Sequence, residues 1–193
     1  MLNCMIAGVG GQGTVLASKL IAQAAMEAGQ NVRTTETIGM AQRGGSVVSH
    51  VRMGDTIYSP LIPLKSADII IAFEPAEGVR LTPYLRDGGI MIVCDTAIKP
   101  VTDSLGGGNY NACEMLSFLS NAVILSGEKL TEKCGSKALN IAMLGAAAQS
   151  GKFPFETDIL ENIIKTKIPE RFREMNLSAF ETGRSMYREF NDI

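Results

Sequence analysis

Two glycine-rich segments carry side chains that could bind an anion or contact another polypeptide. In the first, Gln42 and Arg43 precede Gly44-Gly45, and His50, the only histidine, follows in the same segment. Adjacent glycines allow positive φ or close backbone approach, while amide and guanidinium groups donate directional hydrogen bonds. Taken singly, these residues also fit an ordinary bulge, a solvated Arg43 and a hydrogen-bonded core histidine.

The second segment is the turn Gly8-Val9-Gly10-Gly11-Gln12-Gly13, between a predicted strand over Leu2–Ala7 and a predicted helix. Gly29 is expected to end that helix in the left-handed conformation. In this context the amides at the start of a helix can receive an anion. Glycines also let a helix pack tightly on a strand, so the pattern alone is not specific. No Lys follows Gly13, which excludes the phosphate-binding P-loop.

A dinucleotide-binding fold would need an acidic residue near the end of the second strand, where Glu36 lies. However, the segment 37–46 is too short for the helical crossover that should follow. The alternation over 46–53 predicts an extra strand instead, antiparallel to a neighbour. An NAD-binding dehydrogenase or sensor that uses Gly8, Gly10, Gly13 and Glu36 stays an alternative, disfavoured by the missing crossover.

Further strands and a helix place two carboxylates at one edge of the predicted sheet. The apolar run 68–73 predicts a strand buried on both faces, and Pro75 predicts the start of a helix that extends to 85. Gly88-Gly89 is expected to turn the chain into a strand over 90–95, and 121–125 is expected to form another. Glu74 and Asp95 would then share the carboxyl edge, where open α/β sheets place their sites. Glu74 fits a ligand role and the cap of the following helix about equally well.

The C-terminal third is predicted to be helical. Ser136 is expected to cap a helix over 137–150, whose Gly145 and following alanines would let a neighbour approach closely. Asn140 is the polar exception in that helix, and Asn176, inside the apolar stripe of the last helix, is expected to tie down a loop. The fold class is therefore α/β: three layers around a mostly parallel, mixed sheet, with a Rossmann-like start and a helical C-terminal third.

Composition limits the remaining classes. The 193 residues fit one domain over 1–193, and a net charge of −2 argues against a nucleic-acid partner. No apolar stretch approaches the ~20 residues that span a bilayer, so we expect no membrane association and a cytoplasmic location. The four cysteines form no C-x-x-C pair, hence neither an iron–sulfur nor a zinc site is expected. Cys4 and Cys94 are expected to be buried in strands.

The chain resembles the gamma-type domain of the 2-oxoacid:ferredoxin oxidoreductases, and among them the small subunits of enzymes acting on indolepyruvate and related aryl acids. The resemblance covers nearly the whole chain. Its motifs are Gly8–Gly13, Ala41–Gly45 with Ser49–Arg52, Ser59-Pro60, Phe73–Pro75, Asn140 with Leu144–Ala146, and Asn176 with Ala179-Phe180 and Gly183.

This resemblance implies a subunit that completes an enzyme without performing the chemistry alone. Thiamine diphosphate and iron–sulfur clusters are expected on a large alpha subunit, and ferredoxin is expected to act through the complex. A thiamine-binding segment is not recognisable, since Gly54-Asp55 is followed by Thr56. No catalytic or metal-binding residue is expected in this chain. The substrate could be pyruvate, 2-oxoglutarate, a branched-chain or an aromatic 2-oxoacid, with aryl acids favoured.

Ten residues are predicted to dock the large subunit or to bind coenzyme A, a ligand that the subunits would share. They are Gly8, Gly10, Gly11, Gln12, Gly13, Gln42, Arg43, Gly44, Gly45 and Glu74. Docking is favoured, because glycine-rich turns suit close backbone contact. In the alternative, backbone amides and Arg43 would receive a phosphate of coenzyme A.

Overall fold

The computed structural model describes residues 1–39, 45–99, 103, 108–119 and 121–191. Six strands form one sheet in the order β2-β3-β1-β4-β5-β6. Their bounds are β1 Leu2–Val9, β2 Asn31–Ile38, β3 Ser46–Gly54, β4 Ala67–Ala72, β5 Leu85–Cys94 and β6 Val123–Leu125. β3 is antiparallel to both neighbours, whereas β1, β4, β5 and β6 pair in parallel. The predicted mixed, mostly parallel sheet is confirmed.

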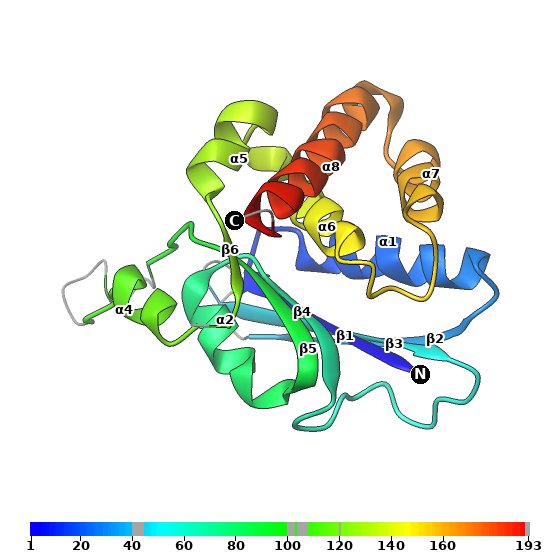
Figure 1. Ribbon diagram of the computed structural model, residues 1–193, viewed down its shortest axis with the longest axis horizontal. Helices are drawn as coiled ribbons and strands as arrows, with labels where there is room; N and C mark the ends of the chain where they lie inside the picture. Colours follow the sequence, from blue (N-terminus) through cyan, green and yellow to red (C-terminus); the bar gives the residue numbers. More distant parts are fainter. Residues whose placement is uncertain (40–44, 100–102, 104–107, 120, 192–193) are drawn as a thin grey trace.

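Helices cover both faces of the sheet and give the expected three layers (Figure 1). One layer contains α1 (Thr14–Glu27), α5 (Gly127–Cys134), α6 (Leu139–Gln149), α7 (Thr157–Lys167) and α8 (Glu170–Asn191). The same layer holds the short 3-10 turn η2 (Ser136–Ala138). The other layer contains α2 (Pro75–Leu81) and α4 (Ala112–Ser117), with a short 3-10 turn at η1 (Thr82–Tyr84). Among the described residues, no helix is long and apolar enough to cross a membrane.

The inserted strand β3 separates β2 from β1. Its residues pair with β1 on one side and β2 on the other, so that Ser49 lies opposite both Ile6 and Glu36. The strand predicted from the alternation over 46–53 is therefore confirmed, including its antiparallel direction. Its insertion moves the end of β2 one strand further from the glycine turn that follows β1.

Alternating side chains of the central strands fill two apolar cores. Ile69 and Ile71 of β4 face the core under α1, α6 and α8, while Ile70 faces the core under α2 and α4. Every residue of β4 is buried, as expected for a strand covered on both faces. Cys4 and Cys94 lie in the first core, as predicted.

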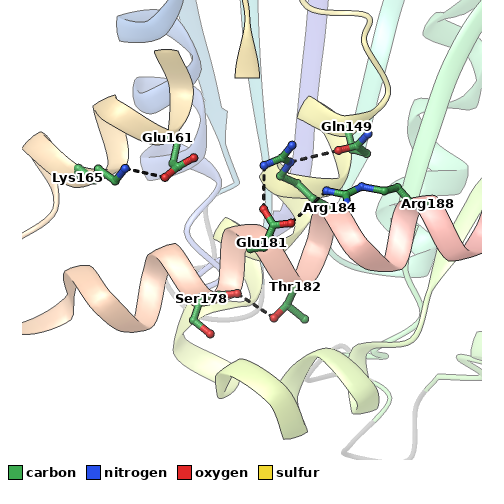
Figure 2. A network of polar contacts seen from close by, with 8 residues as sticks. All are labelled: Gln149, Glu161, Lys165, Ser178, Glu181, Thr182, Arg184 and Arg188. Carbon is green, nitrogen blue, oxygen red and sulfur yellow. Dashed lines mark hydrogen bonds and ion pairs between the residues drawn. The ribbon is translucent and has the colours of Figure 1, made fainter. Parts of the chain in front are cut away.

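Two glycines bring α6 and α8 into direct backbone contact. A Cβ on Gly145 would lie 1.9 Å from the carbonyl oxygen of Phe180, and one on Gly183 would lie 1.7 Å from that of Ala142. The close approach predicted from the small residues of α6 is therefore confirmed. Figure 2 shows a polar contact that flanks this crossing, in which Arg184 of α8 points to Gln149 of α6, with an Nε–Oε1 distance of 3.2 Å.

Two predicted boundaries are wrong. The helix that starts at Pro75 ends at Leu81, and β5 begins already at Leu85 and runs through Gly88-Gly89. Gly88 has a φ of +72°, and the β4–β5 register shifts nearby, so the glycine pair forms an irregularity within a strand instead of a turn before it. Gly29 does end α1 with a φ of +79°, as predicted.

The C-terminal region also differs from the prediction at two polar residues. Ser136 does not cap a helix over 137–150, because it lies in η2 and α6 begins only at Leu139. Asn176 does not tie down a loop. Its side-chain nitrogen donates to the carbonyl oxygen of Phe172, one turn earlier in α8, at 2.7 Å.

Candidate functional site

The predicted site residues that the structure describes lie at the carboxyl edge of the sheet. β1 and β4 end there with the glycine turn and Glu74, and the antiparallel β3 begins there after Gly45. The backbone N–H of Gly10 donates to the carbonyl oxygen of Gly45 at 2.9 Å. The structure thus brings the ends of the two glycine-rich segments together. Gln42, Arg43 and Gly44 lie outside the described residues.

Gln12 joins the two parallel strands at this edge. Its Oε1 accepts from the Val9 N–H at 2.7 Å, and its Nε2 donates to the Phe73 carbonyl oxygen at 2.9 Å. Gly8 leaves room for this side chain, since a Cβ there would lie 2.8 Å from Oε1 of Gln12. Because α1 and α2 cover opposite faces, the β1–β4 junction is the point where such folds bind nucleotides. Gln12 bridges that junction with bonds inside the chain.

Gly13 is the contact point between α1 and α6. It adopts a φ of +84° directly before the first turn of α1, and its carbonyl oxygen accepts from Asn140 Nδ2 at 3.4 Å. Gly11 also has positive φ, at +101°, but a Cβ there would meet nothing within 4 Å. The glycine turn therefore has one position that packs against another helix and one, Gly11, that faces open space.

Glu74 is buried, with 1% of its surface exposed. Its Oε2 caps α2 by accepting from the Glu77 N–H at 3.1 Å, which confirms the capping role. Its Oε1 accepts from the hydroxyl of Tyr110, and burial, together with this contact, raises the pKa of the tyrosine. Both carboxylate oxygens of Glu74 are therefore used inside the chain.

Glu77 connects α2 to the start of β3. Its Oε2 accepts from the Ser46 hydroxyl at 2.5 Å, and its Oε1 pairs with Arg80 at 3.0 Å. Burial raises the pKa of Glu77 above its ordinary value, and the neighbouring Glu74 adds to this, against the lowering effects of Ser46 and Arg80. The carboxyl group of Glu77 thus fixes the start of β3, which follows Gly44-Gly45 in the sequence.

Asp95 lies at the same edge, at the end of β5. Its Oδ1 accepts from the Gly127 N–H at 2.7 Å and so holds the first turn of α5. A Cβ on Gly127 would lie 1.7 Å from the Thr96 hydroxyl oxygen, which explains the glycine there. Glu74 and Asp95 therefore share the predicted edge, and both are bonded to the starts of helices.

His50 and Arg52 lie away from the glycine turns and have structural roles. His50 is buried, and its Nδ1 accepts from the Ile62 N–H at 3.2 Å. Arg52 donates to Asn3 Oδ1 at 2.9 Å and to the carbonyl oxygens of Ser59 and Leu61 at 2.8 and 3.0 Å. Both residues hold the segment 59–62 against the sheet. The reading of His50 as a hydrogen-bonded core residue is therefore confirmed.

The described residues do not fit the iron–sulfur clusters of the 2-oxoacid:ferredoxin oxidoreductases. The cysteines lie on four different elements, β1, β5, α4 and α5, and the described part of the chain contains no group of three His, Cys, Asp or Glu residues that could hold a metal ion. Burial also raises the pKa of Cys94 and of Cys134, which disfavours the thiolate that a cluster requires.

A nicotinamide site is likewise disfavoured by the position of Glu36. Its Oε1 accepts from the Ser18 hydroxyl of α1 at 3.4 Å, and the strand β3 lies between it and the glycine turn. In dinucleotide-binding folds the strand with the acidic residue is the direct neighbour of β1. Here the ribose would have to reach across an additional strand.

Three contributors to the edge are not predicted from the sequence. Tyr110 lies in a segment without periodicity, and Ser46 and Glu77 meet across 31 positions. The only sequence signal for Tyr110 is that it is a lone aromatic residue after a glycine-rich stretch. No sequence pattern predicts that its partner is Glu74.

Comparisons with known proteins agree with this fold. Residues 3–186 match the family described as pyruvate ferredoxin/flavodoxin oxidoreductase. Indolepyruvate oxidoreductase subunit IorB of Pyrococcus horikoshii is 34% identical, over 99% of this chain and 98% of the relative. The corresponding subunit of Archaeoglobus fulgidus is 37% identical, over 94% and 93%.

Solved structures share the architecture. The gamma subunit of a keto/oxoacid ferredoxin oxidoreductase from Geobacter sulfurreducens superposes with a TM-score of 0.71 at 22% identity, covering 98% of this chain and 99% of that one. The 2-oxoglutarate:ferredoxin oxidoreductase of Magnetococcus marinus gives 0.73 at 21% identity, covering 97% of this chain and 31% of that one. With a family match over almost its entire length, the chain belongs to the pyruvate ferredoxin/flavodoxin oxidoreductase family.

Proposed function

We propose that this chain is the small subunit of an indolepyruvate, or related aryl 2-oxoacid, ferredoxin oxidoreductase. The complex would decarboxylate the 2-oxoacid, pass two electrons to ferredoxin and transfer the acyl group to coenzyme A. The observation that carries this proposal is the 34–37% identity to four IorB subunits over at least 94% of the chain. Relatives named for pyruvate or ketoisovalerate match at 26–32%.

The proposal assigns the redox chemistry to another subunit. Iron–sulfur clusters would reside on a large alpha subunit, since the described residues of this chain do not fit them. Thiamine diphosphate would reside there too, since Gly54-Asp55 is followed by Thr56 and no thiamine-binding segment is recognisable. In two relatives the matching region is part of a longer polypeptide. It spans 36% of ketoisovalerate oxidoreductase subunit VorA of Methanothermobacter thermautotrophicus and 31% of the Magnetococcus marinus chain. A domain that other proteins carry fused to further domains is expected to work against a partner.

The glycine-lined edge is our proposed docking face for that partner. Gln12 and Glu74 both form hydrogen bonds within the chain, so they support the edge. Gly11 has open space around its Cα and would allow close backbone contact. The alternative is that the backbone amides and Arg43 bind a phosphate of coenzyme A.

The experiment is co-expression of the tagged chain with the large subunit of an indolepyruvate oxidoreductase from the same organism. We expect a brown complex that contains thiamine diphosphate and iron and reduces ferredoxin with indolepyruvate and coenzyme A. The isolated chain should be inactive. Turnover by the isolated chain, or saturable NAD binding to it, would contradict the proposal, and a preference for pyruvate or 2-oxoglutarate would contradict the substrate assignment.

Substitution of Arg43 by Ala separates the two roles of the edge. Unchanged subunit association with a raised KM for coenzyme A would support coenzyme A binding. Loss of association at unchanged stability of the isolated subunit would support docking. Lys65 is an exposed cation at the opposite edge of the sheet, so Lys65→Ala is the matched control. It should change neither the association of the subunits nor the KM for coenzyme A.

A further inference from the structure

A groove of about 350 Å³ lies beside the glycine turn. It is formed by the first turn of α1, by η2, by the end of α7 and by the first turns of α8. Its apolar wall contains Leu16, Ile168, Phe172 and Met175, and its rim contains Lys137 and Lys167. Three separate helices and a 3-10 turn thus bring apolar side chains and two cations together around one concavity.

Two large apolar side chains of this groove face solvent. Leu16 is 44% exposed and Phe172 is 39% exposed. Leaving apolar surface in water costs about 25 cal/mol per Å², and a concave patch of this kind, rimmed by charged residues, is typical of an interaction site. The wall of the groove is therefore suited to apolar side chains of a partner.

The charged residues at the rim of the groove indicate the charge of the partner segment. Lys137 and Lys167 are exposed, and neither forms an ion pair with any residue that the structure describes. The guanidinium of Arg171 lies 4.7 Å from the ring centroid of Phe172. The groove also faces the first turn of α8, where the helix dipole favours negative charge. Although Glu170 and Glu174 lie nearby on α8, cations outnumber these carboxylates, and the rim is complementary to an acidic segment.

The groove continues the glycine-lined edge. Leu16 follows Gly13 by three residues, and the Asn140 side chain that bonds Gly13 follows Lys137 by three. A polypeptide that covers the glycine turn would therefore reach the groove without leaving the surface. This continuity connects the groove to the face assigned to the large subunit.

On these grounds, and resting on the proposed function, we propose that the groove receives an apolar segment of the large subunit flanked by Asp or Glu residues. The apolar side chains would cover Leu16 and Phe172, and the carboxylates would pair with Lys137 and Lys167. Apolar contact supplies the affinity, while the charges favour this partner and raise the association rate.

The test compares two exposed leucines in the co-expressed complex. Leu16→Asp places a charge in the groove, in the first turn of a helix where an acidic residue is tolerated. Leu64→Asp places the same charge in the loop before β4, at the opposite edge of the sheet, where the leucine is 61% exposed. We expect Leu16→Asp to weaken binding of the large subunit by at least about 30-fold, as for a hot-spot side chain, and Leu64→Asp to leave it unchanged. Both isolated variants should retain the wild-type melting temperature.

The cations provide a second readout. Lys137→Glu together with Lys167→Glu should weaken the complex by about 10-fold at low salt and reduce the salt dependence of the affinity. Unchanged affinity in Leu16→Asp, while the wild-type complex forms, would overturn the groove proposal and leave the proposed function intact. A wild-type chain that fails to bind any large subunit would overturn both. If Leu16→Asp only dissociates a homodimer of this chain, the occupant is a second copy and the proposal is wrong.

Discussion

The side-chain amide of Asn140 fills the space that a methyl group on Gly13 would occupy. Asn140 Nδ2 donates to the Gly13 carbonyl oxygen at 3.4 Å, and a Cβ built on Gly13 would lie 2.3 Å from that nitrogen. The contact joins the start of α1 to α6 across 127 positions of sequence. The last glycine of the N-terminal turn is therefore required for helix packing, whatever else the turn binds.

This relationship predicts coupling between the two positions. Gly13→Ala should destabilise the chain by at least about 2 kcal/mol, because alanine is strained at positive φ and clashes with Asn140. Asn140→Ala should cost about 1 kcal/mol through the lost hydrogen bond. In the double variant the clash is absent, so its loss should be smaller than the sum by about 1 kcal/mol. Urea unfolding of the four proteins measures this, and strict additivity would contradict the contact.

A second prediction concerns the bridge that Gln12 makes between β1 and β4. Gln12→Glu keeps an acceptor for the Val9 N–H but points a carboxylate oxygen at the Phe73 carbonyl oxygen. We expect a loss of about 1–3 kcal/mol, the cost of unsatisfied or opposed polar groups. Gln30→Glu, which changes a partly exposed side chain after α1, is the control and should be nearly neutral. Equal stability of both variants in thermal unfolding would argue against the bridge.

The strands of the sheet could be predicted from the sequence better than the hydrogen bonds at its carboxyl edge. Period-two alternation and continuous apolar runs report burial directly, which is why β3 and β4 were found from Ser46–Met53 and Asp68–Phe73. Gln12 carries no such signal, since its partner Phe73 lies 61 positions away. The site prediction could name the residues of the edge, but not that Gln12 and Glu74 bond within the chain.

The missed helices and boundaries have similar causes. α5 was not predicted, because it is short and is held by tertiary contacts: Asp95 bonds its first turn, and Gly127 packs against Thr96. Gly88-Gly89 predicts a turn because glycine pairs usually end secondary-structure elements. In the folded chain a Cβ on Gly89 would lie 2.8 Å from the Ala67 carbonyl oxygen, so the glycine permits strand pairing.

His50 provides a prediction about pH, and as the only histidine it gives an unambiguous signal. Burial, with a smaller contribution from Arg52, lowers the pKa of its imidazole below 6.5. The unfolded chain then binds more protons between the two pKa values, so stability should fall as the pH decreases below about 6.5. An NMR titration of the imidazole should show a midpoint below 6.5 in the folded chain and near 6.5 in urea. Identical midpoints would contradict the buried, hydrogen-bonded state.

The last prediction concerns the crossing of α6 and α8. Gly183→Ala would place a Cβ 1.7 Å from the Ala142 carbonyl oxygen, and because that oxygen belongs to a helix backbone, the two helices must separate. We expect a loss of about 3 kcal/mol, at the upper end for overpacking, and a fall in melting temperature of about 6–12 °C for a chain of this size. Ser178→Ala, on the exposed face of the same helix, serves as the control and should change the melting temperature by less than about 2 °C. If Gly183→Ala has the same melting temperature as Ser178→Ala, the two helices do not meet at the glycine.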